Sequence, residues 1–124
     1  MNLFHHKVAT QRDNSQYLLN QIQLKSVSLP KDDVNSNFFQ FPLQFKNENE
    51  RDKVNDIMFK NGIDTAKYLD DIKDIATEKY QYQSDCPIAE NCSKTVLIIP
   101  NHYTLSRKDL DHIAKCLNLA GQFL

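Results

Sequence analysis

The amino-acid sequence predicts an α+β fold, with a small antiparallel or mixed sheet of about three strands covered by helices. Several segments carry apolar residues at helical spacing, while others show the alternation or the unbroken apolar run of strands. About three strands are too few for a doubly wound sheet, so we expect helices to cover one face of a small sheet. With 124 residues, the chain is long enough for a single domain, which we expect to span residues 1–124.

The first predicted helix covers residues 7–24, where Tyr17, Leu18 and Ile22 recur at helical steps. Residues 26–37, which contain a proline and several aspartates and asparagines, have the composition of a connecting loop. We therefore expect a helix followed by a loop that leads into the first strand.

The first predicted strand covers residues 38–45. In it, glutamines alternate with apolar residues that we expect to face the core: Phe39, Phe41, Leu43 and Phe45. Pro42 interrupts the pattern, and because proline cannot donate a hydrogen bond to a sheet, we expect an edge strand or a bulge there.

A second helix is predicted over residues 47–62, with acidic residues in its first turn. Asn61 and Gly62 are residue types that commonly end a helix. The following residues, 62–68, predict a short strand, whereas residues 69–84 give no clear preference for helix or strand.

Asp85 predicts the N-cap of a short helix over residues 86–92, because Pro87 then falls in the first turn, where a missing N–H costs nothing. Residues 95–99 predict a central strand covered on both faces, because residues 96–99 are all apolar and show no alternation. Pro100 ends this strand.

A final amphipathic helix follows. Ser106 and Asp109 have the spacing of a capping box. Behind them, four residues form one apolar stripe at helical spacing: Leu110, Ile113, Ala114 and Leu117.

Composition excludes several classes of partner. The net charge of −1 and the charged fraction of 25% are ordinary for a globular protein and give no indication of nucleic-acid binding. No stretch approaches the roughly 18 apolar residues of a membrane span, and no secretory signal is recognisable. We therefore expect a cytoplasmic protein with neither nucleic acid nor membrane as a partner.

Metal and thiol chemistry have little support. The three cysteines, Cys86, Cys92 and Cys116, lack the spacing of a zinc or redox motif, so reduced thiols are expected. We interpret His5–His6 as solvent-facing, because adjacent helix residues point in different directions. The aspartate pairs at 32–33 and 70–71 are interpreted as solvated turn residues.

The candidate binding residues are Asn101, His102 and Tyr103, which directly follow the predicted central strand. His102 is suited to hydrogen bonding or proton exchange near neutral pH, and Tyr103 to stacking or donating its hydroxyl. The alternative is that His102 caps the next helix or faces solvent, while Tyr103 packs on the core.

Five segments, in order, carry a resemblance to a known family. These are Arg12 with Asn14, the strand FFQFPLQF, the pair Arg51–Asp52 followed by GIDTAKY, the turn CPIAE, and the ending LIIPNHYTLSRKDLDHI. From about residue 12 onward, the sequence resembles the C-terminal small domain of the DegT-type (DegT/DnrJ/StrS) sugar aminotransferases, which use pyridoxal phosphate.

The resemblance implies that Asn101, His102 and Tyr103 lie near a sugar-nucleotide substrate, as part of one wall of the cleft. It also implies that the cofactor lysine and the phosphate site belong to a large domain, which is absent from this sequence. We therefore expect no catalytic, cofactor-binding or metal-binding residues here, and a chain that is inactive by itself.

The implied partner is a large aminotransferase domain, in the same or a separate chain. The face that would pack against it is expected to be apolar, so that the free chain self-associates or binds a partner. The alternative function is a stand-alone, non-enzymatic binding module that retains this fold. The N-terminus fits either hypothesis, because Asn2 suits a helix cap whereas Leu3 and Phe4 suit a covered surface.

Overall fold

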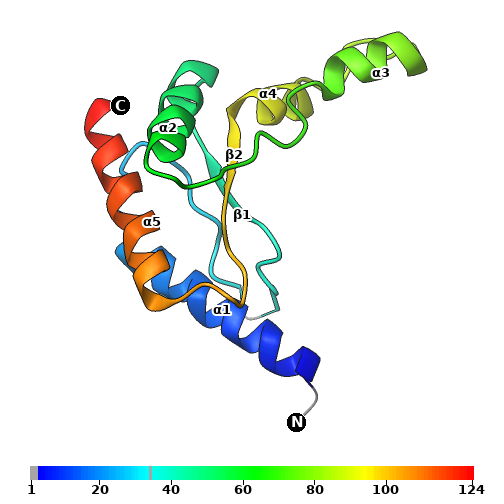
Figure 1. Ribbon diagram of the computed structural model, residues 1–124. Helices are drawn as coiled ribbons and strands as arrows, with labels where there is room; N and C mark the ends of the chain where they lie inside the picture. The colour runs from blue at the N-terminus through cyan, green and yellow to red at the C-terminus, as the bar shows by residue number, and fades with distance from the viewer. Residues whose placement is uncertain (1–2, 34) are drawn as a thin grey trace.

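The computed structural model describes residues 3–33 and 35–124 of the chain (Figure 1). In chain order, the elements are α1 (Leu3–Gln21), β1 (Phe41–Gln44), α2 (Glu48–Lys60), α3 (Ile72–Tyr80), α4 (Pro87–Thr95), β2 (Val96–Ile99), α5 (Arg107–Ala120) and the 3₁₀ turn η1 (Gly121–Phe123). The α+β fold class is confirmed. The first helix begins and ends earlier than predicted, and Asn2 lies outside the described residues.

The sheet consists of two antiparallel strands in the described residues, so the expectation of about three strands was slightly too high. Phe41 pairs with Ile99, and Gln44 pairs with Val96. On the other side of β2, the predicted strand at 62–68 contributes only a single bridge, from Ala66 to Ile98.

The segment beside β2 remains irregular because its neighbouring residues bond to α2 instead. The Ile63 amide donates to the Met58 carbonyl oxygen at 3.0 Å, and the Thr65 hydroxyl donates to Asn55 at 2.7 Å. Ala66 alone is therefore left to exchange two hydrogen bonds with Ile98, each of 2.9 Å.

Pro42 lies on the outer side of β1, as an edge position requires. Two residues further on, Gln44 exchanges hydrogen bonds with Ser28, on the side away from β2. Backbone groups two residues apart point the same way in a strand, so the missing N–H of Pro42 costs no bond to β2.

The strand β1 is shorter than predicted, and the expected alternation fails at its start. Phe39 is 76% exposed, whereas Phe38 is buried. Phe38 has a φ of 48°, in the left-handed region, so the chain turns immediately before the strand and the side-chain order shifts by one residue.

The core lies on one face of the sheet. Buried side chains of both strands meet α1, α2 and α5, which cover that face (Figure 1): Phe41, Leu43, Leu97 and Ile99. The apolar stripe of α5 is buried as predicted, and the Ser106–Asp109 capping box is present. The opposite face is less covered, because Val96 and Ile98 are only half-buried, so the prediction that β2 is covered on both faces was wrong.

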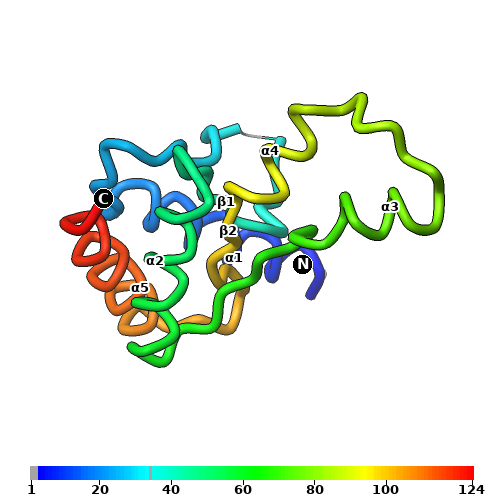
Figure 2. The backbone as a smooth tube through the Cα atoms, turned by 90° about the horizontal axis from the view of Figure 1, so that it is seen from above, coloured from blue at the N-terminus to red at the C-terminus, as the bar shows by residue number. Residues whose placement is uncertain are grey.

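The segment containing α3 and α4 extends away from this core (Figure 1 and Figure 2). Helix α3 lies within the residues for which the sequence gave no clear preference, and it has no buried residue. The short helix α4 begins with Pro87 in its first turn, as predicted. Its N-cap is Cys86, without a side-chain capping hydrogen bond, so the prediction of Asp85 as the cap was wrong. The Cys86 amide donates to the Tyr82 hydroxyl oxygen at 2.7 Å.

A buried arginine fastens this segment to α2. Arg51 is fully buried and donates to Asp70 at 2.6 Å, to Asp52 at 2.9 Å and to the Ser93 carbonyl oxygen at 3.2 Å. Asp70 lies in a turn, as interpreted, but it is only partly exposed to solvent and is also an ion-pair partner of Arg51. The sequence around Asp70 could not show that its partner is Arg51, which lies nineteen positions earlier.

No helix in the described part of the chain is long and apolar enough to cross a membrane.

Candidate functional site

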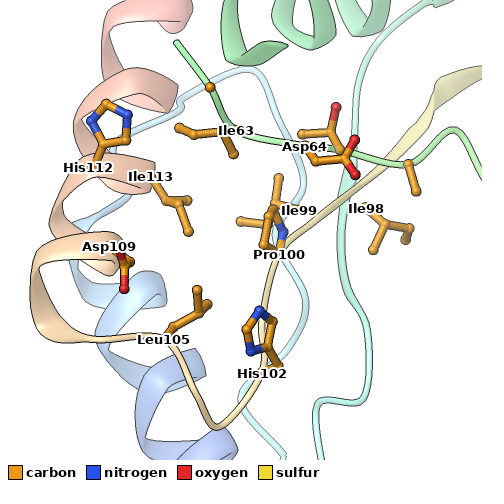
Figure 3. Close-up of a pocket in the computed structure, with 13 residues that line it drawn as sticks. Ile63, Asp64, Ile98, Ile99, Pro100, His102, Leu105, Asp109, His112 and Ile113 are labelled. Carbon is orange, nitrogen blue, oxygen red and sulfur yellow. The ribbon is translucent and has the colours of Figure 1, made fainter.

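A pocket of about 500 Å³ lies where three parts of the chain meet (Figure 3). Its walls are the segment 62–66, the C-terminal end of β2 with the turn after it, and the first turns of α5. Aliphatic side chains make up much of the lining: Ile63, Ile98, Ile99, Leu105 and Ile113. Five polar side chains join them: Asp64, Thr65, His102, Asp109 and His112.

His102 is the predicted site residue that lines this pocket. Its exposed ring hydrogen-bonds through Nδ1 to the Thr104 hydroxyl. The backbone is fixed separately, because the His102 carbonyl oxygen accepts from Asn14 Nδ2 at 3.0 Å and from the Leu105 amide at 3.2 Å. The turn thus presents the imidazole at the pocket from a held backbone.

Asp109 and His112 reach the same pocket from α5, since residues three apart share one face of a helix (Figure 3). Hydrogen bonds from the Ser106 side chain and backbone lower the pKa of Asp109, and the nearby His102 and His112 contribute to the shift. His112 Nε2 lies 2.9 Å from the Asn61 carbonyl oxygen, which connects α5 to the end of α2.

The other two predicted site residues do not line the pocket. Asn101 is only 7% exposed, and its Nδ2 donates to Ser15 Oγ at 2.7 Å and to the Phe38 carbonyl oxygen at 2.8 Å. Tyr103 is 42% exposed, with Lys7 Nζ lying 4.7 Å from its ring centroid. Substrate contact by Asn101, His102 and Tyr103 therefore stays a prediction, and only His102 has access through this pocket.

Sequence reasoning missed Asp64, Asp109 and His112 as pocket residues. Asp109 was assigned only to the helix cap, although its position three residues before His112 could have indicated a shared polar face. Asp64 had no such indication, because its approach to α5 depends on the path of the chain after α2.

The pocket combines an apolar floor with groups that exchange hydrogen bonds with hydroxyls. The carboxylates of Asp64 and Asp109 accept, and an imidazole both donates and accepts. Such an arrangement suits a polyhydroxylated ring that rests one face on aliphatic side chains. The two carboxylates disfavour an anionic group at the same position.

The other histidines and the cysteines form no second candidate site in the described residues. Among residues 3–33 and 35–124, no group of three His, Cys, Asp or Glu side chains is placed to bind a metal ion. His5 and His6 are exposed on α1, as predicted. All three cysteines are free thiols, and burial raises the pKa of the Cys116 thiol.

The fold is shared with solved enzymes. The aminotransferase TlmJ from Streptoalloteichus hindustanus superposes on 92% of this chain with a TM-score of 0.80 at 15% identity. A DegT DnrJ EryC1 StrS aminotransferase from Brucella abortus superposes on 90% of it with a TM-score of 0.74 at 20% identity. The E. coli GDP-4-keto-6-deoxy-D-mannose-3-dehydratase with bound hydrated PLP superposes on 89% with a TM-score of 0.71 at 19% identity.

These likenesses define the chain as an α+β unit with a fold found inside larger aminotransferases and a related dehydratase. More particularly, the chain belongs to the DegT/DnrJ/EryC1/StrS aminotransferase family, whose sequence profile matches residues 1–118. The chain corresponds to only 31% of the length of TlmJ and 30% of the Brucella abortus enzyme. No curated protein sequence matches it.

The residues of the pocket do not fit pyridoxal phosphate, the cofactor associated with the family. The lining contains neither lysine nor arginine to hold the aldehyde or the phosphate, and it contains two carboxylates. The nearby N-terminus of α5 is already neutralised, because the Ser106 and Asp109 side chains cap it. We therefore derive no cofactor chemistry from this chain.

Proposed function

We propose that this chain is the C-terminal small domain of a pyridoxal-phosphate-dependent sugar-nucleotide aminotransferase, and that it forms one wall of the substrate cleft. The main support is that about 90% of the chain superposes on about 30% of an aminotransferase of the same family. The chain would not catalyse the reaction alone. The lysine and the phosphate site would come from a large domain, in the same or a separate chain.

In this proposal, the pocket takes the sugar part of the substrate. The aliphatic floor would pack against the ring, and His102, Asp64 and Asp109 would hydrogen-bond its hydroxyl groups. The negatively charged diphosphate would lie outside the pocket, away from the two carboxylates. Amino-sugar formation for polysaccharide biosynthesis is the process that such a substrate suggests.

The test begins with the genomic DNA on both sides of the coding segment. A continuous or adjacent reading frame for a large domain with a cofactor lysine is the expected result. The complete enzyme should then transfer an amino group from glutamate to a nucleotide-linked keto sugar. His102→Ala should raise KM for the sugar without changing the amount of bound cofactor, whereas His6→Ala, on the exposed part of α1, should change neither.

Two results would contradict the proposal in different ways. A complete enzyme that removes a hydroxyl group from the sugar without adding an amine would indicate a dehydratase, the reaction named for the E. coli structure. The absence of any large-domain frame would favour a stand-alone binding module that keeps the fold. Titrating the free chain with UDP-glucose and following the His102 ring signals by NMR would then test that module directly.

A further inference from the structure

One side of α1 faces the turn at residues 101–103. The helix places Lys7, Gln11, Ser15 and Leu18 at steps of three or four residues, so they share one face, with Asn14 beside them. Leu18 is fully buried and anchors this face in the core. Of the polar residues before it, Lys7, Asn14 and Ser15 contact the turn.

The first link is the amide of Asn14. It is 8% exposed, and its Nδ2 donates to the His102 carbonyl oxygen across 88 residues of sequence. The same oxygen accepts from the Leu105 amide, the bond that closes the turn. Asn14 therefore fixes the position of the His102 backbone, from which the ring extends.

The second link runs through Ser15, which is fully buried. Its hydroxyl donates to the Gln11 carbonyl oxygen at 2.9 Å and accepts from Asn101 Nδ2 at 2.7 Å. The Asn101 amide also donates to the carbonyl oxygen of Phe38, just before β1. One buried amide thus ties α1, the start of β1 and the end of β2 together.

The third link is Lys7, whose Nζ lies 4.7 Å from the centroid of the Tyr103 ring. Three successive residues of the turn are therefore each held by a different residue of α1. A helix is stiff, so the three contacts move together when α1 moves.

We propose that Asn14 and Ser15 are positioning residues, through which α1 sets the orientation of His102 and Tyr103 beside the pocket. Asn101 belongs to this device as the buried partner of Ser15. The inference deepens the proposed function and rests on it for what the turn contacts. The conformation of the turn is a property of the free chain and is measured without a ligand.

The test compares Asn14→Ala with Asn118→Ala in the full chain. Asn118 is a matched control, because its Nδ2 also donates to a backbone carbonyl oxygen of α1, that of Gln21 at 2.9 Å, at the end distant from the turn. NMR would follow the ring signals of His102 and Tyr103 and the hydrogen exchange of the Leu105 amide.

We expect Asn14→Ala to shift the His102 and Tyr103 ring signals and to speed exchange at Leu105 about fivefold, the effect of losing one hydrogen bond. Asn118→Ala should leave all three unchanged. Equal shifts in both variants, or no shift in either, would overturn the proposal.

A surface variant covers the case in which Asn14→Ala fails to fold. Lys7→Gln removes the cation over the ring and should move the Tyr103 ring signals alone, because the bonds of Asn14 and Ser15 remain. Unchanged Tyr103 signals would mean that Lys7 does not hold the Tyr103 ring, and this result would contradict the proposal that α1 positions the turn. These outcomes do not depend on finding a substrate or a large domain, so they separate this inference from the proposed function.

Discussion

At Arg51, burial and charge act on the pKa in opposite directions. Burial acts to lower the pKa of its guanidinium, but hydrogen bonds with Asp70 and Asp52 outweigh burial and leave the pKa raised. Burial likewise acts to raise the pKa of Asp52, yet Lys67 and Arg51 lower it. The charges persist because each has a direct partner.

Replacing Arg51 with methionine should therefore destabilise the chain by about 2–3 kcal/mol. The lost bonds join α2 to Asp70 and to the Ser93 carbonyl oxygen. The cost stays below that of a fully buried pair because Asp70 is 35% exposed and keeps part of its hydration. Urea unfolding would measure the change in free energy.

Lys73→Met is the matched control, since Lys73 pairs with Glu90 at 2.8 Å on a half-exposed surface. A pair of this kind contributes at most about 1 kcal/mol. If both variants lost the same free energy of unfolding, burial of Arg51 would not be what makes its ion pairs important.

At the scale of elements, capping residues fix where the helices α2 and α5 begin and where α2 ends. Helix α5 begins with a complete capping box, and α2 begins with Asn47, whose side chain accepts from the Glu50 amide at 2.9 Å. Gly62 follows α2 with a φ of 75°. Of these features, Gly62 and the first turn of α5 belong to the pocket wall.

The cap of α5 predicts a dependence on pH. Because the folded state lowers the pKa of Asp109 below 3.8, its ionised form stabilises the fold above that pH. This contribution is lost as the pH falls through the folded-state pKa. Asp109→Asn should therefore melt at a lower temperature than wild type near about pH 7, and the difference should shrink towards about pH 2.

Thermal unfolding followed by circular dichroism across this range would measure the effect. Asp56→Asn, an exposed aspartate in the middle of α2, changes the same charge without touching a cap. A difference for Asp109→Asn that stays constant across the range would contradict the assignment to the ionised cap.

Gly62 predicts a backbone effect at the end of α2. A Cβ added there would meet no atom within 4 Å, so the cost of Gly62→Ala comes from its positive φ alone. We expect a loss of about 1 kcal/mol for alanine and a smaller loss for asparagine, which tolerates this conformation better. Equal losses in urea unfolding would mean that backbone strain is not the cause.

At the scale of the whole molecule, the segment with α3 and α4 projects from the core (Figure 2). This segment carries exposed apolar side chains. These are Tyr68, Leu69, Ile72, Ile75, Tyr80 and Ile88. Residues of this kind on a projecting segment are typical of a surface that packs against another domain or chain. They support the partner expected from the sequence.

The free chain should accordingly self-associate, with a mean mass that rises with concentration in analytical ultracentrifugation. The double variant Ile75→Lys and Ile88→Lys should weaken this association. Phe59→Lys is the control, because Phe59 is 73% exposed but lies on α2. A wild-type chain that stays monomeric at all concentrations would contradict the prediction.

The sequence by itself determined the helices α1, α2 and α5, the apolar strands, the caps at Asn61–Gly62 and Ser106–Asp109, and the family resemblance. All of these follow from periodicity, turn residues or short motifs, which act between residues close in sequence. His102 was selected as a candidate in the same way, as a polar residue after a strand.

Only the tertiary structure decided which residues distant in sequence lie near His102. The packing places Asp64 and His112 around the same pocket as His102. It also places Asn14 within hydrogen-bond distance of the His102 carbonyl oxygen. The tertiary structure also buries the side chain of Asn101. Such contacts depend on how helices pack over the sheet, and no local pattern encodes a hydrogen bond between residues 14 and 102.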